Sequence, residues 1–194
     1  MYKSSVVSAI SSDMERSIAT IVTAFTLDPL MRWMLPEPRQ YLVYLPKFLR
    51  FFAGGAFDHA SAYRSEDFNA AALWLPPGIS PDKKSLAQVM QEAVAPALQD
   101  EVFAVFEKVE AAHPDTEHWY LPTIGVDPLF QGKGYGSALL SCGLEICDRN
   151  HVAAYLESTN PKNIPLYQRF GFEIVGKIQA GSSPAITPMF RAAR

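Results

Sequence analysis

The amino-acid sequence predicts a domain of the α/β (α+β) class, and two stretches of the chain carry that prediction. Residues 119–157 read in succession as a strand, a glycine-rich loop, a helix and a second strand. Such a βαβ unit implies a parallel pair of strands, because its helix returns the chain to the same end of the sheet. Residues 60–75 read as a hairpin that stops at Pro76-Pro77-Gly78, and they add antiparallel strands.

Length and composition favour one domain, residues 1–194, with a sizeable core. The chain has 194 residues, of which 48% are hydrophobic and 19% are charged, so it can bury enough apolar surface to fold. The net charge of -3 argues against nucleic acid or a membrane surface as a partner. No apolar run has the length of a membrane helix, and Asp13 and Glu15 follow the N-terminus too soon for a signal-peptide core. We therefore expect a cytoplasmic protein, either a monomer or a homodimer.

The cysteines predict neither a disulfide nor a metal site. Cys142 and Cys147 lie five residues apart in one predicted helix, where they occupy different faces. No group of cysteine and histidine residues has zinc-ligand spacing. Both thiols are expected to be buried helix residues in a reducing compartment, and no metal is expected.

The first part of the chain predicts two helices among the strands. Ser11-Ser12-Asp13 offers N-caps to the first helix, whose apolar residues recur at helical spacing. Pro29, Pro36 and Pro38 are expected to break the chain after it. In chain order we expect a strand over 2–7, a helix over 14–26, a helix over 41–57, and strands over 60–64 and 70–75.

The remainder predicts a helical insertion followed by the βαβ unit. Residues 82–112 have helical periodicity, and Pro96 is expected to split them into a pair of helices over one face of the sheet. After this insertion we expect a strand over 119–126, a loop over 127–133, helices over 134–149 and 161–170, and strands over 152–157, 172–178 and 185–190.

The glycine loop reads Gln131-Gly132-Lys133-Gly134-Tyr135-Gly136-Ser137. Alternate glycines let the backbone approach a ligand closely, and the free N–H groups and dipole of the following helix favour phosphate or pyrophosphate. Lys133 adds a positive charge. The competing interpretation is a helix start that needs glycine only for packing. Neither G-x-G-x-x-G nor G-x-x-x-x-G-K-[ST] is present, so the dinucleotide fingerprint and the P-loop do not fit.

The spacing Q-x-x-G-x-G over residues 131–136, after a hydrophobic strand and Val126-Asp127-Pro128, resembles the GNAT family of acyl-CoA-dependent N-acetyltransferases. Asn160, Tyr167 and Gly171-Phe172 match the later N-(x)6-Y-(x)3-G-F element of that family. The resemblance implies a GNAT fold, with a mixed central sheet splayed between its fourth and fifth strands and helices on both faces. Upstream pieces resemble the puromycin-acetyltransferase-like branch: Asp28-Pro29, Arg32-Trp33, Pro36 and residues 72–78.

The resemblance also implies acetyl-CoA as the co-substrate. The loop amides would take the pyrophosphate, while the main chain of Ile124 and Val126 would pair with the pantetheine arm and the thioester carbonyl. The side chains of these two residues are expected to lie in the core, and Asn160 is expected to contact the arm. The expected coenzyme-binding residues are Ile124, Gly125, Val126, Gln131, Gly132, Lys133, Gly134, Tyr135, Gly136, Ser137, Asn160 and Tyr167.

For the chemistry, the resemblance makes Tyr167 the general acid that protonates the leaving thiolate. The general base stays open between His118, at the start of the splayed strand, and Glu157, at the end of the next one. Histidine titrates near neutral pH, whereas a glutamate needs burial to raise its pKa. Each residue could equally have a purely structural role, and a chain of water molecules could replace a dedicated base.

The acceptor pocket is expected around Phe25, Asp28, Trp33, Trp74 and the inserted helices, which suggests a small amine with an apolar part. The predicted function is transfer of an acetyl group from acetyl-CoA to a primary amine of a small molecule by direct attack. The alternatives are a non-catalytic acyl-CoA-binding regulatory module, which would lose the acid, and a peptide or protein N-acetyltransferase, which would need an open groove. The fold alone does not choose among substrates.

Overall fold

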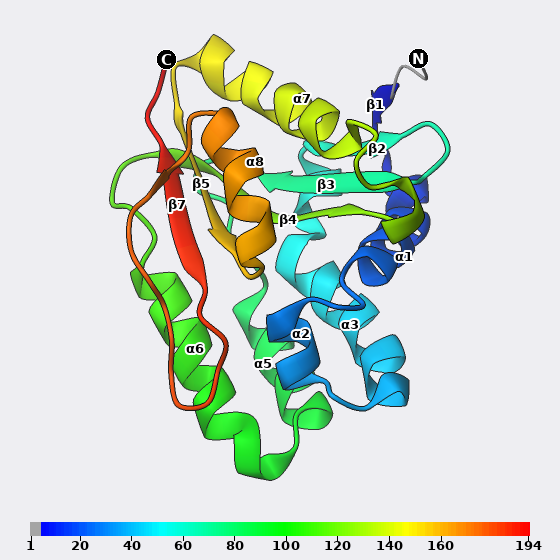
Figure 1. Cartoon of the computed structure of the whole chain (residues 1–194), viewed down its shortest axis with the longest axis vertical. Helices are drawn as coiled ribbons and strands as arrows, with labels where there is room; N and C mark the ends of the chain where they lie inside the picture. The colour runs from blue at the N-terminus through cyan, green and yellow to red at the C-terminus, as the bar shows by residue number, and fades with distance from the viewer. Residues whose placement is uncertain (1–4) are drawn as a thin grey trace.

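A computed structural model describes residues 5–194 and has one seven-stranded mixed sheet with the order β1-β2-β3-β4-β5-β7-β6. Figure 1 shows helices packed on both faces of that sheet. The strands are β1 (Val6–Ser8), β2 (Ala62–Ser65), β3 (Ala70–Leu75), β4 (His118–Val126), β5 (Ala153–Ser158), β6 (Glu173–Ile174) and β7 (Thr187–Arg191). The α-helices are α1 (Met14–Ala24), α2 (Pro29–Met34), α3 (Pro38–Ala53), α4 (Gly55–Asp58), α5 (Lys83–Ala93), α6 (Gln99–Ala111), α7 (Tyr135–Asn150) and α8 (Ile164–Arg169).

The two faces of the sheet bury two separate cores, as the alternation of side chains along β3 shows. Ala71, Leu73 and Leu75 join the core beneath α1, α3, α5 and α6. Their neighbours Ala70, Ala72 and Trp74 point the other way, into the core beneath α7 and α8. Successive side chains of a strand face opposite sides of the sheet, so a central strand covered on both sides is buried along its whole length. The predicted α/β class and helices on both faces are confirmed.

The sheet splays between β4 and β5, as the resemblance predicted. These parallel strands pair only where His118, Trp119 and Tyr120 lie opposite residues 153–155. Beyond Tyr120, β4 keeps only its antiparallel partner β3, while β5 continues along β7. The backbone of residues 121–126 therefore has one open hydrogen-bonding side in the middle of the sheet.

Prolines begin helices in the segment where the sequence predicted breaks. Pro29 occupies the first turn of α2, whose N-cap Asp28 accepts hydrogen bonds from the amides of Leu30 and Met31, both at 3.0 Å. Pro38 likewise begins α3. A missing N–H costs nothing in the first helical turn, and proline already has a helical φ. The helix predicted over 41–57 is consequently longer at its start and ends at Ala53, before the separate α4.

Other boundaries also differ from the prediction. The strand expected over 172–178 is reduced to β6, followed by a single bridge between Ile178 and Ile186. The strand expected over 2–7 corresponds to β1, and residues 2–4 lie outside the described residues. Residues 82–112 form the expected pair, α5 and α6, separated by a 3₁₀ turn at Pro96–Leu98.

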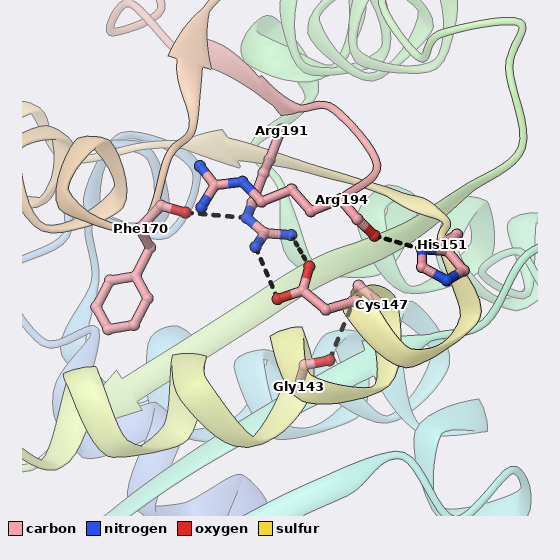
Figure 2. A network of polar contacts seen from close by, with 7 residues as sticks. Gly143, Cys147, His151, Phe170, Arg191 and Arg194 are labelled. Carbon is pink, nitrogen blue, oxygen red and sulfur yellow. Dashed lines mark hydrogen bonds and ion pairs between the residues drawn. The ribbon is translucent and has the colours of Figure 1, made fainter.

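A polar network around the buried Arg191 side chain fixes the C-terminal strand against α7 and α8 (Figure 2). The Arg191 guanidinium donates to both carboxylate oxygens of Asp148 at 2.7 and 2.9 Å, and to the Phe170 carbonyl at 3.0 Å. His151 Nδ1 lies 2.6 Å from the Arg194 carbonyl. A bidentate pair has a defined geometry, so the network fixes the end of α8, the helix that carries Tyr167.

Candidate active site

The glycine loop stands directly in front of α7. Gly134 is the N-cap with φ +89°, and Gly132 has φ +73°, values in the left-handed region that glycine adopts without strain. The first amides of a helix have no helical partner, and within residues 5–194 no backbone hydrogen bond takes up the amides of residues 132–137. These N–H groups and the helix dipole together form an anion-binding site.

Two side chains of the loop are hydrogen-bonded to neighbouring backbone carbonyls. Gln131 Nε2 donates to the Val126 carbonyl at 3.2 Å, which ties the loop to the end of β4. Lys133 Nζ donates to the Leu129 carbonyl at 3.1 Å and lies 4.6 Å from the centre of the Phe130 ring. Lys133 is not among the residues that line the adjacent cavity, so the site consists of backbone rather than of the lysine charge.

A cavity of about 660 Å³ joins this loop to the open side of β4. Most of the predicted coenzyme-binding residues line it: Ile124, Gly125, Val126, Gln131, Gly132, Gly134, Tyr135, Gly136, Ser137, Asn160 and Tyr167. The side chains of Ile124 and Val126 are half-buried against the second core, as expected. Gly125 has a packing role too, because a Cβ there would lie 2.8 Å from the Ala24 Cβ on α1.

Asn160 and Tyr167 both follow β5, Asn160 in the turn after the strand and Tyr167 on α8. Asn160 caps the short 3₁₀ turn, with its Oδ1 accepting from the Lys162 amide at 3.1 Å. Tyr167 is buried, and burial together with the nearby Asp28 charge raises the pKa of its hydroxyl. A phenol with a raised pKa stays protonated at neutral pH, so Tyr167 can donate a proton into the cavity that it lines.

Asp28 connects this turn to α2. Its Oδ2 accepts from the Thr159 hydroxyl at 2.5 Å, while its Oδ1 takes the two amides of the α2 cap. Burial raises the pKa of the Asp28 carboxyl, and these hydrogen bonds offset part of the rise. Both oxygens are therefore occupied by the protein.

Glu157 presents a buried carboxylate to the cavity. Its side chain is 7% exposed, and within residues 5–194 its Oε1 atom has no hydrogen-bond partner. Burial raises the pKa of Glu157 to about 7, with partial compensation from the Tyr120 and Tyr155 hydroxyls. Burial and the Glu157 charge in turn raise the pKa of both tyrosines. A carboxylate that titrates near neutral pH suits proton abstraction.

His118, the other predicted base, lies away from the cavity. Its Nδ1 is 2.7 Å from the Thr116 carbonyl and its Nε2 is 3.1 Å from Nδ1 of His113. His113 in turn places its Nε2 3.4 Å from Glu157 Oε1, and burial and the neighbouring His118 lower the pKa of His113 to about 4. His113 is not among the residues predicted from the sequence, because it follows the inserted helices and belongs to no recognisable motif.

The wall opposite the glycine loop is aromatic. Phe48, Phe52 and Phe106 line the cavity with ring centres 5.1 to 6.3 Å apart, and Tyr120 lies 6.2 Å from Phe52. Phe25 and Asp28 line the cavity as predicted. The predicted Trp33 and Trp74 do not.

Each of these two tryptophans lies elsewhere for a specific reason. Trp33 donates from Nε1 to the Ser182 hydroxyl at 3.1 Å. Trp74 is fully buried beneath α7, where a Cβ on Gly143 would lie 2.2 Å from the indole nitrogen. Aromatic residues at strand ends pack into the core as readily as into a pocket, and the sequence does not distinguish the two.

The splayed strand β4, the glycine loop and Tyr167 on α8 occur together in a known protein family. Residues 91–172 match the model of the acetyltransferase (GNAT) family. The chain carries a GNAT acetyltransferase domain. An uncharacterized N-acetyltransferase of Schizosaccharomyces pombe is 25% identical over 176 residues, 84% of this chain and 71% of that protein. As a GNAT protein with N-acetyltransferase relatives, this chain is an acetyl-CoA-dependent N-acetyltransferase.

Solved structures share the fold of this GNAT protein over nearly its whole length. A histone acetyltransferase HPA2-related protein of Corynebacterium glutamicum has a TM-score of 0.70 at 24% identity, covering 98% of this chain and 96% of that one. Arylalkylamine N-acetyltransferase 2 of Aedes aegypti has a TM-score of 0.65 at 13% identity, covering 98% and 99%. Such similarity supports the fold, while the substrate has to be argued from the site.

The described part of the chain has neither a metal-ligand cluster nor a membrane-spanning helix. Within residues 5–194 no cluster of three or more His, Cys, Asp or Glu side chains could hold a metal ion. Of the helices in that part of the chain, none is long and apolar enough to cross a membrane.

Proposed function

We propose that this GNAT protein transfers the acetyl group of acetyl-CoA to the primary amine of a small molecule with an apolar, preferably aromatic, body. One observation carries the proposal: a single cavity joins the glycine loop, the buried carboxylate of Glu157 and a wall of phenylalanines. An anion-binding end, a proton acceptor and an apolar end are the three elements that this reaction needs.

The residues fit the coenzyme. Acetyl-CoA supplies an activated acetyl group as a thioester. The amides of residues 132–137, which find no backbone partner in the part of the chain that the structure describes, suit a pyrophosphate. The open side of β4 at Ile124 and Val126 suits the amides of an extended pantetheine arm, as a sheet edge suits a peptide.

Glu157 acts as the general base and Tyr167 as the general acid. Glu157 takes a proton from the acceptor ammonium, so that a neutral amine attacks, and its pKa of about 7 matches that role. Tyr167 keeps its proton and gives it to the departing thiolate. Glu157 on β5 and Tyr167 on the following helix α8 both line the cavity.

The charges of the cavity favour a monoamine. Asp28 and Glu157 are the acidic residues among those that line it, and the Asp28 oxygens already accept three hydrogen bonds from the protein. Proteins of the same fold include agmatine, polyamine and arylalkylamine N-acetyltransferases. A substrate with two cations would leave its second charge against the phenylalanines, whereas an arylalkylamine would place its ring there.

A panel of amines tests the proposal. Acetyl-CoA would be incubated with arylalkylamines, alkyl monoamines, polyamines, amino acids, aminonucleosides and peptides, and thiol release would be followed. We expect the highest kcat/KM with an apolar monoamine, and a decrease of about tenfold or more with a polyamine of similar length. A preference for peptides would favour a peptide N-acetyltransferase, and coenzyme binding without any thiol release would favour a non-catalytic module.

A further inference from the structure

Behind Glu157, on the side away from the cavity, two histidines continue the line of polar atoms. Glu157 Oε1 lies 3.4 Å from His113 Nε2, His113 Nδ1 lies 3.1 Å from His118 Nε2, and His118 Nδ1 lies 2.7 Å from the Thr116 carbonyl. Neither histidine lines the cavity, and the part of the line at Thr116 is exposed. The line therefore leads from the reaction site to the protein surface.

The carbonyl at the end of the line fixes the tautomer of each ring. Because a carbonyl oxygen only accepts, His118 carries its proton on Nδ1 and leaves Nε2 as an acceptor. His113 must then donate from Nδ1 to that atom, which leaves the lone pair of its Nε2 facing Glu157. In this arrangement His113 Nε2 can accept a proton from the Glu157 carboxyl.

We propose that His113 and His118 relay to solvent the proton that Glu157 takes from the amine. The O–H bond of the Glu157 carboxyl breaks as an N–H bond forms on His113 Nε2. At the same time the His113 Nδ1 proton moves to His118 Nε2. His118, now an imidazolium, releases its Nδ1 proton to water, and reorientation of the two rings then returns the remaining ring protons to their starting positions. No electron changes hands, and Glu157 is again a carboxylate for the next turnover.

The surroundings favour transfer over storage of the proton at His113. Burial, the adjacent His118 and the Lys83 ammonium all disfavour a positive charge on His113. The Glu110 carboxylate, which is ion-paired with Lys83, favours that charge but does not outweigh them. The Tyr120 and Tyr155 rings pack against His113 at centroid distances of 4.6 and 4.7 Å and hold its orientation. A concerted transfer, in which His113 gains one proton as it loses another, avoids the disfavoured cation.

The test compares acetyl transfer with proton release. Rapid mixing of parent protein with acetyl-CoA and its best amine would follow thiol release with a thiol reagent and proton release with a pH indicator. Both signals should rise at the same rate in the parent. In His118→Ala and His113→Gln, proton release should lag and kcat should fall by about tenfold or more, with the coenzyme Kd unchanged. His59→Ala, which removes an exposed histidine elsewhere on the surface, is the matched control.

Added imidazole distinguishes a relay from a structural role. Because His118 stands at the exposed end of the line, imidazole should restore much of the kcat of His118→Ala while leaving the parent unchanged. The inference rests on the proposed function, and the two fail differently. A parent without acetyl transfer overturns the function. An active parent whose two variants keep kcat within about twofold, or lose activity that imidazole does not restore, overturns the relay.

Discussion

At the scale of single residues, Glu157 predicts a pH dependence of activity. A base must be deprotonated to act, and burial raises its pKa to about 7. We therefore expect kcat/KM to rise with pH through a midpoint near 7, and Glu157→Gln to abolish that limb with a loss of about 10²- to 10⁴-fold in rate. Acceptors of different amine pKa separate this limb from ionisation of the substrate. A limb that follows the amine and survives in Glu157→Gln would exclude Glu157 as the base.

The same residue predicts a pH-dependent stability. A carboxyl whose pKa is higher in the folded state stabilises the fold below its unfolded pKa, near 4.5, and loses that contribution as pH rises through about 7. Glu157→Gln cannot become charged, so at pH 8 it should be more stable than the parent by between about 1 and 3 kcal/mol. The gain should shrink towards pH 4.5, and thermal unfolding across this range measures it. An equal effect at pH 4.5 and pH 8 would contradict the prediction.

Tyr167→Phe tests the proposed acid. The substitution removes one hydroxyl and leaves the buried ring, so the fold and the coenzyme Kd should be unchanged. If the hydroxyl protonates the thiolate, kcat should fall by about 10²- to 10⁴-fold. Phe172, whose ring lies 6.3 Å from that of Tyr167, has no hydroxyl and offers Phe172→Leu as a control for packing alone. A kcat close to that of the parent, with chemistry rate-limiting, would exclude the role.

At the scale of elements, Ser137→Asp tests the glycine loop without disturbing α7. An acidic side chain in the first turn is favourable for a helix, but it places a negative charge where the pyrophosphate is proposed to bind. We expect an unchanged melting temperature and a loss of about tenfold or more in acetyl-CoA affinity by calorimetry. Ser141→Asp, one turn further along α7 and exposed, should bind normally. Equal affinities in the two variants would remove the loop from the coenzyme site.

The contact between Gly143 on α7 and Trp74 on β3 is tightly packed. A Cβ at Gly143 would lie 2.2 to 2.7 Å from three atoms of the Trp74 indole, so Gly143→Ala must displace a fully buried side chain. Denaturant unfolding should show a loss of about 1–3 kcal/mol, the usual range for overpacking. The double variant with Trp74→Phe should lose less than the two single changes together, because the smaller ring makes room. Strict additivity would contradict a direct clash.

The elements themselves were largely predictable, because local patterns determine them. Strand, loop and helix of the βαβ unit follow from periodicity and from glycine chemistry, and the glycine loop and Tyr167 line one cavity. The details that failed depend on contacts distant in the chain. Whether Trp74 lines a pocket depends on Gly143, and whether His118 faces the amine depends on His113. No spacing in the sequence encodes either contact.

At the scale of the whole molecule, three parts of the chain beside the aromatic wall of the cavity meet at Ser182. Its amide and hydroxyl donate to Glu101 Oε2 at 2.6 and 2.7 Å, and Trp33 on α2 donates to its hydroxyl. Figure 1 shows the long connection before β7 running alongside α6. Ile186 on this connection and Phe106 on α6 both line the cavity.

Glu101→Ala should loosen the contact between α6 and the connection before β7. We expect KM for the amine to rise by about threefold to tenfold, because the apolar wall is less well positioned, while acetyl-CoA affinity stays the same. Glu107→Ala, an exposed change on the same helix, is the control. Steady-state kinetics with each substrate varied in turn makes the comparison. A change confined to the coenzyme constant would mean that the connection acts on the other end of the cavity.

The divergence of β4 from β5 also bears on aggregation. Unpaired strand backbone is normally a hazard at the rim of a sheet, where another molecule can add a strand. In this protein the open side of residues 121–126 faces a cavity, with the glycine loop at one end and the phenylalanine wall at the other. A slender extended ligand can reach these groups, whereas a strand that belongs to another folded sheet is too broad to enter. The open strand backbone is thus accessible to a small molecule in the cavity but not to a strand of a second copy of the protein.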